Sequence, residues 1–271
     1  MTLMNPLLEI GQPPLEAASS LRIQTLGGFR IWRDGLEIEP TAWGREKALH
    51  LFQFFVTVRR HSSRLHKEQI IDRLWPELDA EEGDRDFKVA LNTVYKVLEP
   101  ERKPRAESRF IQRQGLVYSL NLAEAWVDAD AFEAWVAAGN RVLPGDVAVA
   151  IQQYQQALAL YGGDYLPERR YEDWSSAARE RLHLLALGVM TNLANLLVEQ
   201  SPLESIRLTQ HVLMVDPVWE EAYRVQMRAY LVQGNRPLAL RTYQQCVRTL
   251  DQELGVEPLP ETRQLFEQVK R

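Results

Sequence analysis

The chain has 271 residues and a net charge of −5, with 45% hydrophobic and 25% charged residues, which are ordinary values for a globular protein. It contains no run of about 18 apolar residues and no basic, apolar leader, so we expect neither a membrane span nor a secretory signal. The single cysteine, Cys246, excludes an internal disulfide framework and favours a reducing compartment, so we expect a cytoplasmic protein.

The two parts of the chain differ in charge. Residues 21–120 carry a net charge of +3, whereas the remaining residues carry −8. A polyanionic partner such as DNA is therefore expected to bind the first part of the chain rather than the second.

The first 20 residues contain three prolines and no aromatic residue, and we expect a flexible segment there. After them, alternating apolar and polar residues predict three short antiparallel strands at 21–26, 29–33 and 36–40. The period then lengthens to that of a helix, and apolar stripes predict helices at 45–60, 66–75 and 84–99. Two short strands within 109–121, turning at Gln114-Gly115, follow.

The helix predicted at 84–99 has two faces. Its apolar residues recur every three or four positions and form one stripe: Phe87, Ala90, Leu91, Val94 and Leu98. The residues off that stripe include three cations and an amide: Arg85, Lys88, Asn92 and Lys96. Cations neutralise phosphates and an Asn side chain can pair with an adenine edge, so this face suits a DNA major groove. For the helix taken alone, an ordinary solvated face is the alternative interpretation.

Strands, three helices and a hairpin follow one another in the order of a winged helix-turn-helix. In that fold the third helix enters the major groove and the hairpin is the wing. Arg109 and Arg113 lie on the predicted hairpin, where Arg113 is placed to reach a phosphate or the minor groove. A leading antiparallel sheet is typical of the OmpR/PhoB-type subclass, so we predict an α+β DNA-binding domain of that type at 21–122.

From residue 128 onward the pattern is helical, with helices predicted at 128–139, 146–161, 171–199, 203–214, 218–233, 236–253 and 260–270. The stretches that begin at Ser205 and Ala239 correspond at an offset of 34 residues, which is the tetratricopeptide period. Residues 128–271 are therefore predicted to form an all-α, tetratricopeptide-like helical repeat domain rather than a generic bundle. Stacked helical hairpins normally bind a protein or peptide and do no chemistry.

Together the two parts resemble the bacterial transcriptional activator domain (BTAD) family, which includes the antibiotic regulatory proteins. The resemblance covers nearly all of 21–271. In the first part it rests on LGGFRIWRDG, on EQIIDRLWPELDAEEGDRDFKVALNTVYKVLEP and on FIQRQGLVYSLN. In the second part it rests on VDADAFEAWV, on ALALYGGDYLP followed by YEDWSSAARERL, and on QELGVEPLPETRQLFEQV. The resemblance implies a sequence-specific DNA-binding transcriptional activator whose helical domain serves dimerisation and contact with RNA polymerase.

The resemblance also assigns roles to residues. It implies that four residues of the recognition helix face DNA, with Arg85 near the start of that helix: Lys88, Asn92, Thr93 and Lys96. The loop 77–83 matches the loop that touches RNA polymerase in OmpR-type proteins, and its acids are Glu77, Asp79, Glu81 and Glu82. We expect these acids to face a basic partner such as a sigma factor, and a merely soluble loop is the alternative. Asp164, Trp174 and Arg181 match strong positions of the helical domain, and we assign them structural roles as turn, packing and pairing residues rather than roles in ligand binding.

The expected partners are double-stranded DNA and RNA polymerase. A homodimer on DNA is also expected, because a single winged helix covers only a short half-site. The competing interpretation is a protein-interaction scaffold, or the effector module of a larger NTPase-type regulator, with weak or no DNA binding of its own.

An enzyme is not expected, because the sequence lacks the common phosphate-loop, zinc-protease and serine-hydrolase motifs. No cofactor is expected either. His61 and His66 are five residues apart with no cysteine near them, so a backbone contact is preferred over a zinc site. Cys246 lies in an apolar stripe and is expected to be a core thiol. Asp128 and Asp130 are expected to begin a helix rather than to act as acid and base.

Overall fold

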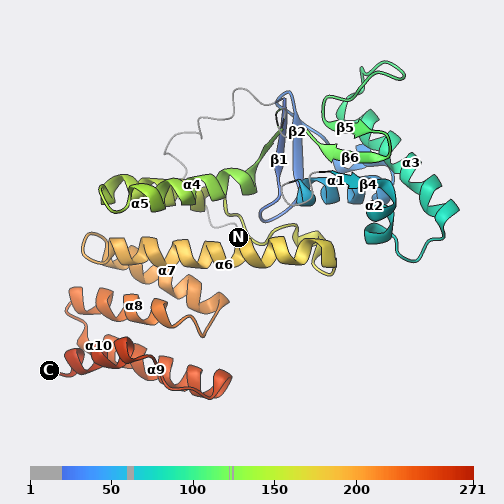
Figure 1. Cartoon of the computed structure of the whole chain (residues 1–271). Helices are drawn as coiled ribbons and strands as arrows, with labels where there is room; N and C mark the ends of the chain where they lie inside the picture. The colour runs from blue at the N-terminus through green and yellow to red at the C-terminus, as the bar shows by residue number, and fades with distance from the viewer. Residues whose placement is uncertain (1–19, 60–63, 122, 124) are drawn as a thin grey trace. The chain divides into compact units, whose positions relative to one another are not determined.

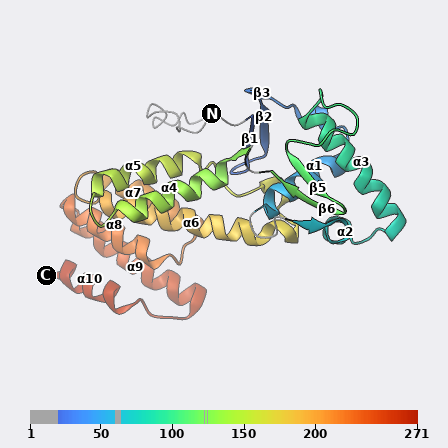
Figure 2. The same cartoon turned by 45° about the horizontal axis from the view of Figure 1, so that its top comes forward.

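The structure is a computed structural model that describes residues 20–59, 64–121, 123 and 125–271 (Figures 1 and 2). The segment predicted to be flexible lies outside the described residues except for Ser20. The chain forms two compact units, of which unit 1 comprises residues 1–131 and 160–182 and unit 2 comprises residues 132–159 and 183–271. Among the helices of the described residues, none is both long and apolar enough to cross a membrane.

Unit 1 contains a four-stranded sheet with the strand order β3-β2-β1-β7. The strands β1 (Leu21–Gln24), β2 (Arg30–Arg33) and β3 (Leu36–Glu37) are antiparallel neighbours, as predicted. The fourth strand, β7 (Ala125–Val127), pairs in parallel with β1 and was not predicted. Three residues are too few for an alternating pattern to stand out in a sequence, which explains why β7 was missed.

Three helices follow the first sheet: α1 (Glu46–Val58), α2 (Lys67–Leu74) and α3 (Ala80–Leu98). The short 3-10 helix η1 (Pro40–Trp43) leads into α1. Along α1, every residue from His50 to Val56 is buried, which leaves this helix with no solvated face there. The helix is therefore a central element of unit 1 and packs against α3.

A second sheet in unit 1 has the strand order β4-β6-β5. The hairpin β5 (Ile111–Gln114) and β6 (Val117–Leu120) matches the prediction, but Gln114 pairs with Val117, so the turn residues are Gly115 and Leu116. Gly115 has a φ of +63°, which favours glycine at the first turn position and shifts the turn by one residue. The two-residue strand β4 (Leu65–His66), which was not predicted, pairs with β6.

The later helices belong mainly to unit 2, and two of them begin in unit 1. They are α4 (Asp128–Val142), α5 (Val147–Leu160), α6 (Asp173–Leu197), α7 (Pro202–Val215), α8 (Glu220–Val232), α9 (Arg236–Leu254) and α10 (Pro260–Lys270). Each predicted helix after residue 128 is present, with ends that differ by at most three residues. The 3-10 helix η3 (Pro167–Arg169) was not predicted.

Unit 2 is held together by apolar contacts between successive helices. An added Cβ at Gly139 would lie 2.5 Å from the ring of Tyr154, so glycine allows α4 and α5 to approach closely. Cys246 is buried in a cluster with Tyr223 and Leu250, and burial raises the pKa of its thiol to about 12. The prediction of a core thiol at Cys246 is therefore confirmed.

Candidate DNA-binding surface

The helix α3 begins at Ala80, four residues before the predicted start. The carboxylate of Asp79 caps it by accepting hydrogen bonds from the backbone N–H groups of Glu81 and Glu82, both at 2.9 Å. Acidic side chains in a first helical turn are stabilised by the helix dipole. The prediction of a loop over 77–83 is therefore wrong from Ala80 onward, because Glu81 and Glu82 lie in the first turn of α3. Asp79 is the N-cap of that helix, and Glu77 remains in the loop.

The two predicted faces of α3 are present. The predicted apolar stripe is buried: Phe87, Ala90, Leu91, Val94 and Leu98. The predicted polar face is exposed: Arg85, Lys88, Asn92 and Lys96. The rings of Phe87 and Tyr118 meet edge to face at 5.1 Å between centroids, which packs the buried face of α3 against the hairpin.

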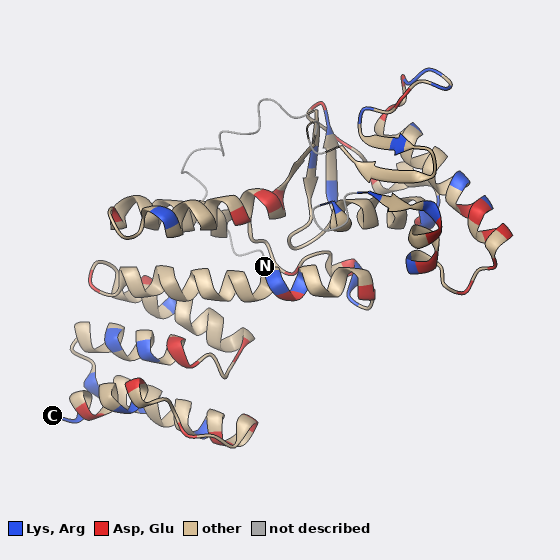
Figure 3. Ribbon diagram, viewed as in Figure 1, with Lys and Arg blue, Asp and Glu red and all other residues tan. Residues whose placement is uncertain are grey.

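Acidic residues lie among the basic ones toward the N-terminal end of α3 (Figure 3), and their ion pairs neutralise part of the cationic face. Asp84 contacts the amines of Lys67 and Lys88, with the Lys88 Nζ at 2.5 Å, and these hydrogen bonds lower the pKa of the Asp84 carboxyl. Asp86 accepts from Lys47 Nζ at 2.5 Å, which likewise lowers its pKa. Lys88 therefore shares a carboxylate with Lys67, so its charge is partly compensated within the protein.

Thr93 lies at the edge of the exposed face and is only partly exposed. Its hydroxyl donates to the backbone carbonyl of Val89 at 3.2 Å, so its hydrogen is used within the helix. On the other edge, the guanidinium of Arg102 lies 4.3 Å above the ring of Tyr95. This contact joins the loop after α3 to the helix and was not predicted.

The two arginines predicted on the hairpin are exposed but have partners within unit 1. Arg113 Nε donates to the carbonyl of Gly115 at 2.8 Å, and its guanidinium lies over the ring of Tyr118. Arg109 stands before β5, where its Nη2 donates to the hydroxyl of Ser20 at 3.1 Å. Arg113 therefore lies on the hairpin next to its turn, whereas Arg109 lies at the base of the hairpin next to Ser20.

Two further contacts fix the position of α3, and neither has a signal that a sequence pattern would reveal. An added Cβ at Gly83 would lie 2.6 Å from Cγ2 of Ile71, so glycine sets the distance between α2 and α3. At the other end of the helix, Arg33 Nη1 of β2 donates to the carbonyl of Val97 at 2.7 Å. A cation at a helix C-terminus is favoured by the helix dipole.

The connection between β1 and β2 is anchored by residues from beyond 122. The buried carboxylate of Asp128 accepts hydrogen bonds from the N–H and hydroxyl of Thr25, from the N–H of Leu26 and from the N–H of Ala129. Burial raises the pKa of Asp128, against the effect of these four donors. Asp130 pairs with the buried guanidinium of Arg59 at the end of α1. Since α4 begins at Asp128, the prediction that these acids begin a helix is confirmed.

Residues 160–182, called here the 160–182 segment, pack on the same part of unit 1. Gly27 has a φ of +80°, and an added Cβ there would lie 2.5 Å from the backbone carbonyl carbon of Gly162. The backbone N–H of Gly27 donates to the carbonyl of Asp164 at 2.9 Å, and Leu166 N–H donates to the carbonyl of Thr25 at 2.9 Å. Gly27, which lies between the strands predicted at 21–26 and 29–33, is thus a point of backbone-to-backbone contact.

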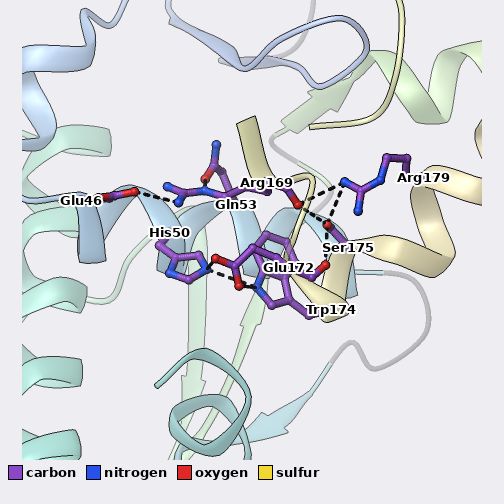
Figure 4. A network of polar contacts seen from close by, with 8 residues as sticks. All are labelled: Glu46, His50, Gln53, Arg169, Glu172, Trp174, Ser175 and Arg179. Atoms are coloured by element: carbon purple, nitrogen blue, oxygen red, sulfur yellow. Dashed lines mark hydrogen bonds and ion pairs between the residues drawn. The ribbon is translucent and has the colours of Figure 1, made fainter. Parts of the chain in front are cut away.

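A polar network joins the 160–182 segment to α1 (Figure 4). Arg169 donates to Gln53 at 2.7 Å and to Glu46 at 2.9 Å. Trp174 Nε1 lies 3.2 Å from both Nε2 of His50 and a carboxylate oxygen of Glu172, and it donates to His50 only when that nitrogen carries no proton. Burial, followed by the charge of Arg169, lowers the pKa of His50. Trp174 also packs edge to face on Phe54, in agreement with its predicted packing role.

The histidine pair considered for a zinc site is described only in part. His66 caps α2, where its Nδ1 accepts from the backbone N–H of Glu68 at 3.4 Å, so the predicted backbone contact is confirmed for this residue. His61 lies outside the described residues. Over the described ranges, no group of three or more His, Cys, Asp or Glu side chains is placed to hold a metal ion. Arg181 is exposed, and its pairing stays a prediction.

Comparison with known proteins agrees with this arrangement. Residues 127–270 match the family model described as the bacterial transcriptional activator domain. The chain is similar to the regulatory protein AfsR of Streptomyces coelicolor, with 25% identity over 94% of this chain and 24% of AfsR. Its fold is similar to that of Mycobacterium tuberculosis EmbR, solved in complex with a low affinity phosphopeptide, with 20% identity and a TM-score of 0.80. That likeness covers 93% of this chain and 65% of the EmbR chain. The chain thus spans about a quarter of AfsR and less than two thirds of EmbR.

Proposed function

Because the chain belongs to the family of the bacterial transcriptional activator domain, we propose that it is a sequence-specific DNA-binding transcriptional activator that uses α3 as its recognition helix. The observation that carries the proposal is the exposed face of α3, where Arg85, Asn92 and Lys96 lie opposite a buried apolar stripe. Cations contribute affinity through phosphates, and the amide contributes base preference.

The elements of unit 1 support an OmpR/PhoB-type winged helix-turn-helix. The helices α2 and α3 correspond to the helix-turn-helix unit, the hairpin β5–β6 to the wing, and the sheet β3-β2-β1 to the leading sheet of that subclass. Arg113 is then the wing residue nearest a phosphate or the minor groove. Arg109, bonded to Ser20, contributes to the positive field rather than to a direct base contact.

The helices from 128 to 271 are proposed to form a tetratricopeptide-like surface for dimerisation and for RNA polymerase. The 34-residue correspondence supports this, as do fully buried Ala222 and Ala229 and a positive φ at Gly234 between α8 and α9. The acids at the start of α3 remain candidates for contact with a basic partner such as a sigma factor. Glu77 is the best single candidate, because Asp79 is used as a helix cap and the other two acids stabilise the first turn.

Selection of bound duplexes from a random pool tests this proposal and gives both the motif and the spacing of its repeats. Binding to the selected duplex should weaken steeply as salt rises, with a slope of about 0.9 for each phosphate contact in a plot of log affinity against log salt. Lys96→Ala should lower that slope by about one. The matched control is Lys270→Ala, which removes an exposed lysine from the last helical residue of unit 2 and should leave the slope unchanged.

Asn92→Ala should relax base preference while largely preserving the salt slope, because an amide contacts bases and carries no charge. A chain that selects no motif, or that binds with no salt dependence, would contradict the proposed function. That result would favour the scaffold or effector-module alternative. The pairing of Asp84 and Asp86 with lysines is the observation that favours this alternative, because it reduces the cationic field of α3.

A further inference from the structure

Val89 is an apolar side chain on the outward face of α3. It is 41% exposed and follows Arg85 by four residues, precedes Asn92 by three and precedes Lys96 by seven. At 3.6 residues per turn, these spacings place Val89 on the same stripe as all three. Along α3, whose residues are all described, Val89 is the one large hydrophobic side chain that is exposed.

The surroundings of Val89 toward α1 are mixed in character. A hollow beside it is lined by Ala48 and Ala90 as well as by Thr93, whose hydroxyl hydrogen is directed to the Val89 carbonyl. Three charged residues also line this hollow: Lys47 and Asp86, which are paired with each other, and Arg45. A single exposed valine on a protein surface is ordinary and needs no explanation. This valine differs because it lies between an arginine and an asparagine on the face proposed to enter a groove.

The chemistry of the major groove offers one apolar feature that such a side chain fits. Thymine carries a C5-methyl group there, and apolar side chains contact it, whereas cytosine has no such group. Asn92, one turn further along the same stripe, has the side chain that pairs with N7 and N6 of adenine. The two residues together would favour a site rich in A·T pairs.

We propose that Val89 contacts the C5-methyl group of a thymine in the major groove and is a specificity-determining residue of α3. This inference rests on the proposed function and names a base contact that the exposed polar residues do not provide. The contact is apolar, so it contributes to base preference without changing the number of phosphates that the chain neutralises.

The experiment replaces each thymine of the selected duplex by deoxyuridine, one at a time, which removes only the methyl group. At one thymine per half-site, binding of the wild-type chain should weaken about fourfold, as expected for loss of one buried methyl. Val89→Ala should weaken binding to the thymine duplex and should show no further loss with deoxyuridine. Alanine is the best helix former, so this substitution should preserve α3. The matched control is Val232→Ala, which truncates a valine that is 42% exposed in α8.

The outcomes separate this inference from the function on which it rests. A motif without thymine, or a deoxyuridine effect of equal size in the wild type and in Val89→Ala, would overturn the role of Val89. Salt-dependent, sequence-selective binding would still stand in either case. A wild-type chain that binds no duplex would instead overturn the proposed function itself. A deoxyuridine effect that is lost in Val89→Ala and kept in Val232→Ala supports the thymine contact.

Discussion

Gly83 is the position where a single methyl group should test the geometry of α2 and α3. In Gly83→Ala the added Cβ would lie 2.6 Å from Cγ2 of Ile71, about 1 Å closer than a favourable carbon contact. Ile71 is only 7% exposed, so its methyl has little room to move. Such overpacking costs about 1–3 kcal/mol. Replacing a helical glycine by alanine returns at most about 1 kcal/mol. We therefore expect Gly83→Ala to be neutral or to destabilise unit 1 by up to about 2 kcal/mol.

A second substitution isolates the contact. Ile71→Leu keeps the side-chain volume but moves the branch away from Cβ, so the methyl that meets position 83 is removed at a cost below about 1.5 kcal/mol. In that background Gly83→Ala should stabilise the chain, as for an unobstructed helical glycine. The coupling free energy between the two substitutions, from urea denaturation of the four chains, should be about 1–3 kcal/mol.

Duplex binding by the same four chains provides the functional readout. Because a displaced α3 changes the placement of its exposed face, Gly83→Ala should bind the selected duplex more weakly, and Ile71→Leu should restore binding. If Gly83→Ala stabilised the wild-type and Ile71→Leu chains equally, the close approach of α2 and α3 would be refuted.

Three other substitutions follow from the same structure. Asp84→Asn removes the carboxylate that pairs with Lys67 and Lys88. Binding to non-specific DNA should therefore tighten, and the slope of log affinity against log salt should steepen by about one. An unchanged slope would count against this charge pairing. Gly139→Ala should be neutral or destabilise unit 2 by up to about 2 kcal/mol because of the aromatic ring beside it, whereas Gly188→Ala, with no atom in the way, should stabilise it by up to about 1 kcal/mol. Equal shifts in denaturant titrations would contradict this difference. Burial lowers the folded-state pKa of His50, so the stability it contributes is present above its unfolded pKa of about 6.5 and is lost as the pH falls toward the folded pKa. The unfolding temperature of unit 1 should therefore fall less at acid pH in His50→Gln than in the wild-type chain. An equal pH dependence in the two chains would contradict the lowered pKa of His50.

Much of the fold could be predicted from the sequence because its helices are long and periodic. The helices after residue 128 appear within three residues of their predicted ends, and the buried stripe of α3 is the predicted one. The start of α3 was misplaced because Gly83 was taken as part of a loop. Gly83 lies inside the helix instead, where the close contact with Ile71 of α2 leaves no room for a Cβ. The capping role of Asp79 is a local signal that could have located the start of the helix.

The parts that could not be predicted depend on contacts between residues distant in sequence. The charge state of the face of α3 depends on Lys47 and Lys67, which lie on other helices and pair with its acids. The four-residue strands of the first sheet alternate visibly, whereas β7 has three residues and gains its partner from β1 about 100 residues earlier. The periodicity of apolar residues along a sequence contains no information about such partners.

Unit 1 extends beyond the predicted domain boundary at 122–128, because residues 128–131 and the 160–182 segment also belong to it. Cutting there would remove the Asp128 carboxylate, which accepts from the backbone N–H groups of Thr25 and Leu26. Each buried donor left without a partner costs about 1–3 kcal/mol, against a total stability of about 5–15 kcal/mol for a typical domain. The cut would also remove the 160–182 segment, and with it the fully buried side chains of Tyr165 and Leu166.

The motif LYGGDYLP thereby receives a structural explanation. Its glycines allow the backbone to approach Gly27 of the first sheet, and its last apolar residues complete the core of unit 1. Part of the region that matches the activator-domain family is therefore part of the unit that carries α3. A substitution at Gly162 should consequently affect duplex binding through the stability of unit 1, although the residue lies outside the predicted winged helix.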